Sequence, residues 1–294
     1  MYYAEVFLFL HVENITALLM RKTIFIILMF MCAVSSASSQ TSKTVRKHQK
    51  TASTEQNAAS VIKPLKDSKW QGKKVGFLGN SITEMGYYVR AYAKLTGCKA
   101  INFGKSATHM AKIDVNDSLS FDSRFVKLPN DLDMVIVFGG TNDFGHVRTA
   151  PFGKFTDGPA ANEITFYAGL HRLFKGLSLK YRDKPVVIMT PIHHGSEVDT
   201  PEYTIGSSDC IDEAKNPTTG KTFKDYVNAI KEVAAFYSLP VIDAYSSSGL
   251  TPFTEIGKTN RYYFLDGLHP NELGGMKLAR WMYPQLEMVY DMFY

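Results

Sequence analysis

Five short apolar segments rich in Val, Ile and Phe constrain the fold of this chain most strongly. Their apolar residues are continuous rather than alternating, which is typical of strands that are covered on both faces. Segments with helical spacing separate them, and this alternation implies right-handed crossovers and a parallel sheet. We therefore predict one three-layer α/β/α sandwich around a central five-stranded parallel sheet. The expected strands span residues 74–79, 99–104, 133–140, 185–190 and 240–243, and the expected helices span roughly 84–96, 162–181, 222–238 and 272–289.

The first 69 residues differ in composition from the rest of the chain. From Met20, two basic residues precede an apolar run and then small residues, which is the pattern of a secretory signal peptide. The run is about half of the roughly 20 residues that a membrane-spanning helix needs, so we expect no stable span after signal removal. We predict a leader over 1–40 with its true start at Met20, a flexible basic linker over 41–69, and a folded domain over 70–294. The expected location is the periplasm or the exterior of a bacterial cell.

The distribution of charge and cysteine excludes several classes of function. The chain has a formal charge of +5, but residues 41–74 hold nine basic and two acidic residues, which leaves −2 from residue 75 onward. A folded domain that binds nucleic acid needs a clustered basic face, so we expect no nucleic-acid partner. The three cysteines form no C-x-x-C pair, and we predict no metal site and no cofactor. Export would permit a disulfide between Cys98 and Cys210, which the sequence leaves open.

Polar residues follow the first three predicted strands at the points where those strands end. Ser81 follows the first strand, the "GKSAT" turn follows the second, and Asn142 follows the third. Ligands of open parallel sheets gather at the carboxyl ends of the strands, so these groups are expected to converge. Ser81 has two interpretations: it forms a capping box with Glu84, or it is a nucleophile exposed at a strand-to-helix turn.

A serine nucleophile needs a base, and the sequence offers one just before the last predicted helix. In "FLDGLHPNELGG", Asp266 could fix the tautomer of His269 and leave its second ring nitrogen free for Ser81. The D-x-x-H pattern is weak alone, and Asp143 with His146 forms a second copy of it.

Taken together, these motifs resemble the SGNH-hydrolase superfamily, which includes the GDSL esterases and lipases. The similar blocks are "GNSIT" at 79–83, "GGTND" at 139–143 and "DGLHP" at 266–270, and the resemblance covers about residues 73–290. It implies a flavodoxin-like version of the five-stranded sheet and a secreted bacterial serine esterase without a cofactor. The implied catalytic residues are Ser81, Asp266 and His269, and Asn142 is the implied side-chain donor to the oxyanion.

The chain departs from the family pattern at two positions. Asn80 stands where aspartate is commoner. The family's second block corresponds here to "NFGKSATHM" at 102–110, and its oxyanion glycine falls at Ala107 unless Gly104 takes its place. The donor there is a backbone N–H, which alanine keeps, so the function survives if the turn does not demand a positive φ. The expected oxyanion hole is therefore formed by the amides of Ser81 and Ala107 with the side chain of Asn142.

The substrate is the least constrained part of the prediction. No long apolar lid is evident in residues 193–221, which favours short acyl groups such as the O-acetyl groups of carbohydrates. A lipase, lysophospholipase or thioesterase of the same superfamily is the first alternative, and a glycan-binding module with a vestigial catalytic set is the second. We expect a small-molecule or glycan ester to contact residues near the strand ends, and the candidates are Asn80, His109, Phe144, His146 and His193.

Overall fold

The computed structural model of the protein describes residues 67–193, 195, 214–252 and 262–294. The predicted leader, nearly all of the predicted linker, and Cys210 lie outside these residues. Cys98 is buried and has no disulfide partner within the described part of the chain. In that part, no helix combines the length and the apolar character needed to cross a membrane.

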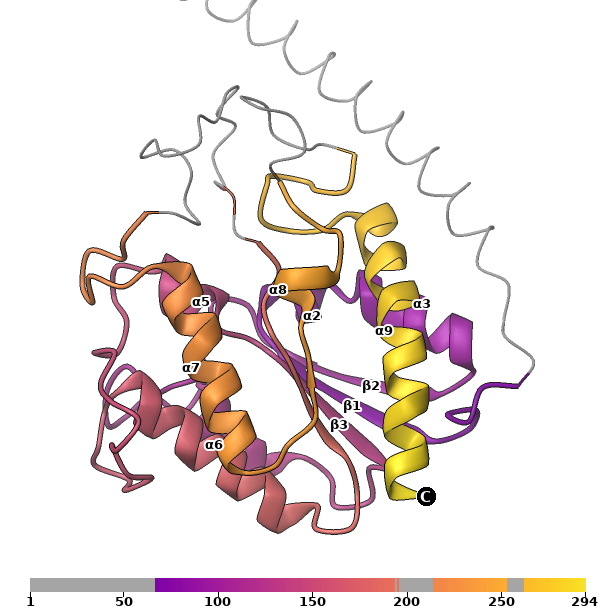
Figure 1. The fold of residues 1–294 in the computed structure, drawn as a ribbon, viewed down its shortest axis with the longest axis horizontal. Helices are drawn as coiled ribbons and strands as arrows, with labels where there is room; N and C mark the ends of the chain where they lie inside the picture. The colour runs from indigo at the N-terminus through magenta and orange to yellow at the C-terminus, as the bar shows by residue number, and fades with distance from the viewer. Residues whose placement is uncertain (1–66, 194, 196–213, 253–261) are drawn as a thin grey trace, which may run out of the picture. The chain divides into compact units, whose positions relative to one another are not determined.

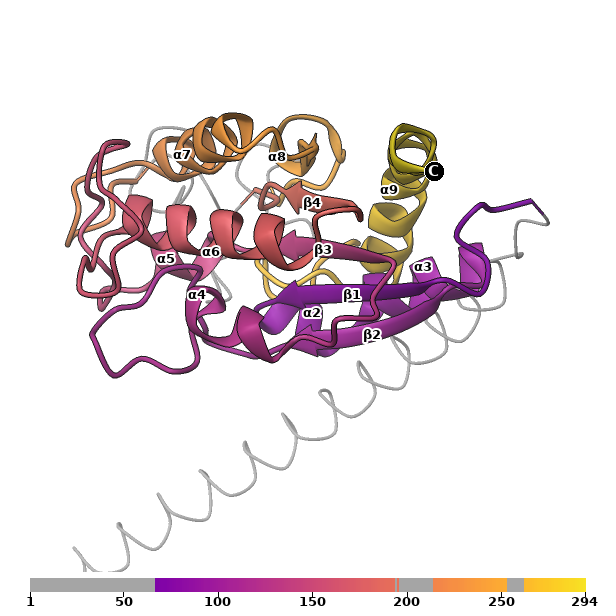
Figure 2. The same cartoon turned by 90° about the horizontal axis from the view of Figure 1, so that it is seen from below.

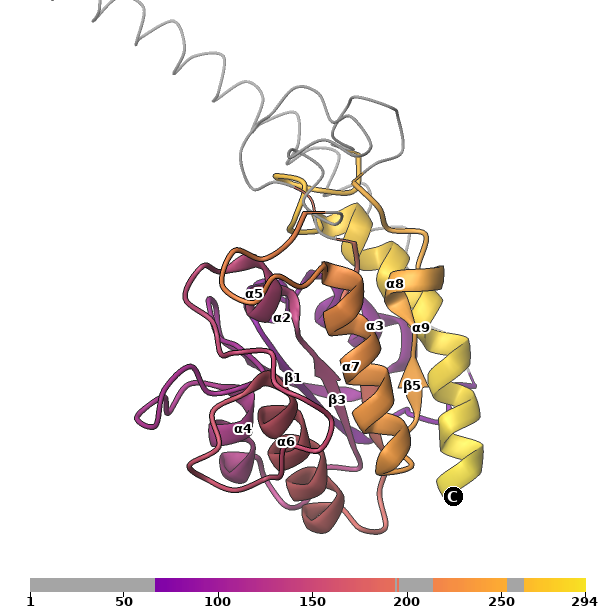
Figure 3. The same cartoon turned by 60° about the vertical axis from the view of Figure 1, so that its left-hand side comes forward.

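The predicted five-stranded parallel sheet is confirmed, in the order β2-β1-β3-β4-β5 (Figures 1–3). This order is the flavodoxin-like one. Its register aligns Gly79 at the end of β1 with Gly104 of β2 and Phe138 of β3, so the three strands end at one edge. The strands are β1 (Lys74–Gly79), β2 (Lys99–Gly104), β3 (Met134–Phe138), β4 (Val186–Met189) and β5 (Val241–Ile242).

Alternate residues of the central strand enter two separate cores, which explains the unbroken apolar runs. In β3, Met134, Ile136 and Phe138 belong to the core that also includes residues of α3 (Tyr87–Thr96) and α9 (Glu272–Phe293). Val135 and Val137 belong to the core that includes residues of α6 (Phe166–Lys180) and α7 (Phe223–Phe236). Every β3 side chain is at most 1% exposed. Two helical layers therefore cover the sheet (Figure 2).

The helix predicted at 84–96 is two helices, because the chain bends sharply at Gly86. The first is α2 (Ser81–Met85) and the second is α3. Gly86 has φ +73°, a backbone conformation that favours glycine. The remaining described helices are α4 (Phe121–Arg124), the 3₁₀ helix η1 (Phe125–Lys127), α5 (Thr141–Gly145) and α8 (Ala244–Ser247).

Candidate active site

The turn between β1 and α2 presents Ser81 as the first residue of a short helix. A Cβ at Gly79 would lie 1.8 Å from Thr83 Oγ1, so only glycine permits the strand to turn this tightly into the helix. The helix is capped by Asn80, whose side-chain oxygen accepts a hydrogen bond from the amide of Ile82 at 3.1 Å. The capping box of Ser81 with Glu84 is therefore wrong: the cap lies one residue earlier, and the Ser81 hydroxyl is left for other contacts.

The structure brings Ser81, His269 and Asp266 into one chain of hydrogen bonds. Ser81 Oγ lies 2.9 Å from His269 Nε2, although the two residues are 188 positions apart. His269 Nδ1 lies 2.7 Å from Asp266 Oδ2. Because an ionised carboxylate only accepts hydrogen bonds, this contact places the proton on Nδ1 and leaves Nε2 as the acceptor for the serine hydroxyl.

The turn before α9 holds the Asp266 carboxylate in place. Its second oxygen, Oδ1, accepts the amides of Leu268 and His269 at 2.9 and 2.7 Å. Burial raises the pKa of Asp266, but the hydrogen bonds from the His269 ring and from these amides outweigh it, and the net pKa is lowered. Asp266 is therefore an anion wherever His269 is neutral, as the orientation of the imidazole requires.

Asn142 comes from the first turn of α5, directly after β3. Its Nδ2 donates to the carbonyl of Thr108 at 2.9 Å, which fixes the orientation of the amide because a carbonyl can only accept. Nδ2 has a second proton, so one N–H of Asn142 is available for a substrate oxygen. The side chain is 6% exposed, and its hydrogen bonds are therefore shielded from water.

The second-block loop uses Ala107 in the left-handed conformation, with φ 59°. The turn therefore does have a positive φ at this position, and alanine adopts there a conformation that costs an L-residue roughly 1–2 kcal/mol. The alternative donor, Gly104, gives its amide to Asn102 Oδ1 at 2.8 Å, so that N–H is already occupied. These contacts favour Ala107 over Gly104 as the backbone donor to an oxyanion.

Two of the predicted substrate contacts are instead structural residues. The Asn80 side chain is 2% exposed and caps α2, and Phe144 is 3% exposed and stacks on Phe223 inside the core, so neither fits that role. His109 is 6% exposed, and its Nε2 lies 3.1 Å from His146 Nδ1. His193 packs on Tyr245 with the ring centroids 4.2 Å apart. Contact of His109, His146 and His193 with substrate stays a prediction.

The second D-x-x-H copy does not form a histidine–carboxylate pair. Asp143 instead accepts the amides of Met110 and Ala111 at 2.9 and 3.1 Å, and it thereby ties the segment after Thr108 to α5. Among the described residues, no group of three or more His, Cys, Asp or Glu is arranged to hold a metal ion.

The pH dependence of stability tests the buried state of Asp143. Burial raises the pKa of Asp143 to about 7 from an unfolded value of 3.8, despite its two amide donors. The folded state then binds the proton more tightly, so this group's contribution to the free energy of unfolding falls as pH rises from about 4 to about 7. In urea unfolding, the free energy of unfolding of the wild type minus that of Asp143→Asn should decrease steadily over this range, because only the wild type carries the carboxyl group that titrates. A difference that is constant with pH would contradict the account.

Removal of the Asn142 amide should impair catalysis without unfolding the protein. Loss of one oxyanion donor typically lowers kcat by about 10²- to 10³-fold, and we expect Asn142→Ala to fall in that range. The measurement is ester hydrolysis at saturating substrate, with circular dichroism to verify the fold. Wild-type turnover in the folded variant would remove Asn142 from the site.

The fold and the site together define a hydrolase of the three-layer α/β/α type that acts on ester bonds. More narrowly, the chain belongs to the GDSL-like lipase/acylhydrolase family, whose model matches residues 77–275. This match confirms the SGNH-hydrolase resemblance of the sequence motifs. Among curated proteins, none matches this chain significantly.

Solved structures of other proteins share the fold of this chain. A protein from Lactobacillus plantarum shares 28% identity and a TM-score of 0.61, over 74% of this chain and 98% of its own. A protein from Chitinophaga pinensis, described as a possible lipase, shares 20% identity and a TM-score of 0.55, over 74% of this chain and 98% of its own. At 20% identity, the second likeness shows the fold alone.

Proposed function

We propose that this protein is an exported serine esterase that removes short acyl groups, such as O-acetyl groups, from carbohydrates. The observation that carries the chemistry is the continuous contact from Asp266 through His269 to Ser81, at 2.7 and 2.9 Å. Family membership supports ester hydrolysis. The second N–H of Asn142 and the left-handed backbone at Ala107 are the features from which we propose the oxyanion hole.

The reaction proceeds through an acyl-serine ester. His269 Nε2 takes the proton of the Ser81 hydroxyl while Oγ bonds to the ester carbonyl carbon. The resulting oxyanion accepts hydrogen bonds from the amides of Ser81 and Ala107 and from the free N–H of Asn142. The C–O bond to the alcohol then breaks, and His269 returns the proton to the leaving oxygen. Water repeats the sequence on the acyl-enzyme and releases the acid and the serine.

The preference for short acyl groups rests on the sequence and is the part that most needs a test. The segment at 193–221, where a lid would lie, falls largely outside the described residues. Chromogenic acetate and octanoate esters should be compared by kcat/KM, together with acetate release from an acetylated polysaccharide, and Ser81→Ala serves as the blank. Higher kcat/KM for acetate supports the proposal. Preference for octanoate would instead favour the lipase or thioesterase alternative, and glycan binding without hydrolysis would favour the vestigial module.

The proposed export is tested separately from the chemistry. The full chain carrying a C-terminal tag should be recovered outside the bacterial cytoplasm, with a mature N-terminus close to Ala37. Recovery of the uncleaved chain from the cytoplasm of a secretion-competent cell would contradict the export and leave the esterase proposal standing.

A further inference from the structure

The loop that follows β2, defined here as the oxyanion loop over residues 104–108, is held by side chains from two helices. On one side, the Glu84 carboxylate of α2 accepts both the amide and the hydroxyl of Ser106, and its distance to the amide is 2.8 Å. These hydrogen bonds lower the pKa of Glu84, so it stays an anion. Ala107, the left-handed residue, directly follows this first attachment.

On the other side, the guanidinium of Arg124 joins three separate segments. Its Nη1 donates to the carbonyl of Phe103 in β2, and its Nη2 donates to the carbonyl of Gly79 at the end of β1. The same Nη2 contacts Thr108 Oγ1 at 3.3 Å. The guanidinium also lies over the Phe121 ring, 4.8 Å from its centroid. A planar group with several fixed donors is suited to bridging acceptors that point in different directions.

Thr108 is the residue through which Arg124 reaches the proposed oxyanion donors. Its hydroxyl accepts from Arg124 and donates to the Lys105 carbonyl at 2.6 Å, which closes the loop around Ala107. Its own carbonyl accepts the Asn142 amide. A shift of Thr108 would therefore move the Ala107 N–H and the Asn142 N–H together.

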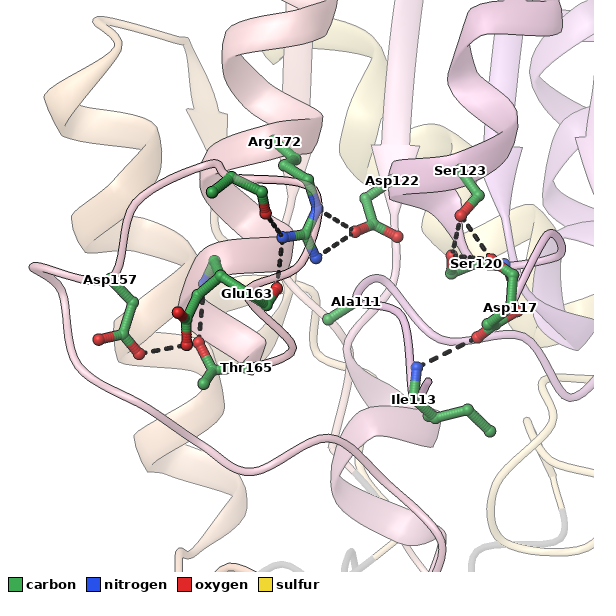
Figure 4. Close-up of polar contacts among 12 residues, drawn as sticks. Ala111, Ile113, Asp117, Ser120, Asp122, Ser123, Asp157, Glu163, Thr165 and Arg172 are labelled. Atoms are coloured by element: carbon green, nitrogen blue, oxygen red, sulfur yellow. Dashed lines mark hydrogen bonds and ion pairs between the residues drawn. The ribbon is translucent and has the colours of Figure 1, made fainter. Parts of the chain in front are cut away.

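The helix that carries Arg124 is itself anchored by buried and internal contacts (Figure 4). The buried side chain of Asp122 pairs with Arg172 of α6, whose Nε and Nη2 lie 2.8 and 2.7 Å from the same carboxylate oxygen. Just before α4, Asp117 accepts the amides of Leu119 and Ser120 at 3.0 and 3.1 Å. These contacts hold the backbone of α4 in place, and the Arg124 side chain reaches from this helix to the ends of β1 and β2.

We infer that Arg124 is a positioning residue for ester hydrolysis: it holds Thr108, and through Thr108 the oxyanion loop and Asn142, in the geometry that stabilises the oxyanion. This inference rests on the proposed esterase function. Arg124 does not touch the reacting atoms. Glu84 holds Ser106 and Arg124 holds Thr108, so both neighbours of the left-handed Ala107 are fixed by hydrogen bonds.

The first test is Arg124→Lys, which keeps the charge but replaces two donor nitrogens, Nη1 and Nη2, by a single one that cannot occupy both positions. A misplacement of about 1 Å at a catalytic group can cost roughly 10²-fold, so we expect kcat to fall about 10- to 100-fold with little change in KM. Thr108→Val removes only the hydroxyl link and should lower kcat in the same direction, and Thr108→Ser should restore it. Wild-type kcat in both Arg124→Lys and Thr108→Val would overturn the inference.

A stability control separates positioning from general destabilisation. Trp70→Phe removes the buried hydrogen bond from Nε1 to the Leu286 carbonyl, next to the start of β1 and away from the strand ends. It should lower Tm without lowering kcat at a temperature where all variants are folded. If Trp70→Phe lowers kcat as much as Arg124→Lys, the effect of Arg124 is structural and the inference fails.

A double-variant cycle gives the most specific readout. If Arg124 acts through Thr108 on Asn142, Arg124→Lys combined with Asn142→Ala should lose clearly less than the product of the two single losses. Multiplicative losses would contradict the inference.

Ser81→Ala is assayed in parallel: wild-type turnover there would overturn the proposed function and the inference together, whereas an inactive Ser81→Ala beside a fully active Arg124→Lys overturns the inference alone.

Discussion

Replacement of His269 by alanine is expected to lower kcat by about 10⁴- to 10⁶-fold, the largest loss of any histidine substitution in this chain. The imidazole is the only base within 2.9 Å of the Ser81 hydroxyl that the described residues provide. A serine hydroxyl does not attack an ester at neutral pH unless its proton is accepted. The measurement is the steady-state hydrolysis of a chromogenic acetate ester, with folding verified by circular dichroism.

His171→Ala is the matched control for this prediction. His171 is a buried histidine of α6 whose Nε2 lies 2.9 Å from the Phe155 carbonyl and whose Nδ1 lies 3.1 Å from the Tyr237 hydroxyl. Its loss should lower the thermal stability and leave kcat within about twofold of the wild type, since it has no part in the proposed site. Equal kcat losses in the two variants would show that His269 acts through stability rather than catalysis.

Asp266→Asn is expected to lower kcat by about 10⁴-fold at neutral pH while the protein stays folded. An asparagine amide that donates toward His269 Nδ1 would favour the opposite tautomer, in which Nε2 carries the proton and cannot accept from Ser81. Asp114→Asn, at an exposed ion pair with Arg148, is the control and should be neutral. Activity of Asp266→Asn close to the wild-type value would mean that the carboxylate does not set the tautomer.

The sequence was sufficient for the fold because each central strand is buried on both faces. The five continuous apolar segments predicted all five strands, and the predicted strand boundaries differ from the observed ones by at most two residues at either end. The error at residues 84–96 arose because helical periodicity continues across Gly86, whereas the left-handed backbone of that glycine ends one helix and begins the next.

The site was predictable where a motif supplies side chains and unpredictable where backbone groups are the partners. The spacing of Asp266 and His269 indicated their contact, and the order of the blocks indicated Ser81. No sequence pattern marked Arg124, because its partners are two carbonyls, 21 and 45 positions away, and a threonine hydroxyl. The capping box at Ser81 was one of two interpretations, and the sequence could not distinguish Ser81 from Asn80 as the cap because both residue types are favourable there.

The most direct test of the account is the site at which a fluorophosphonate probe reacts with the full chain. Such a probe forms a stable bond only with an activated nucleophile, and peptide mass spectrometry identifies the residue. We expect one adduct on Ser81 in the wild type, no adduct in Ser81→Ala, and a strongly slowed reaction in His269→Ala. An adduct on another residue, or labelling that persists in Ser81→Ala, would contradict the central claim that Ser81 and His269 form the reactive pair.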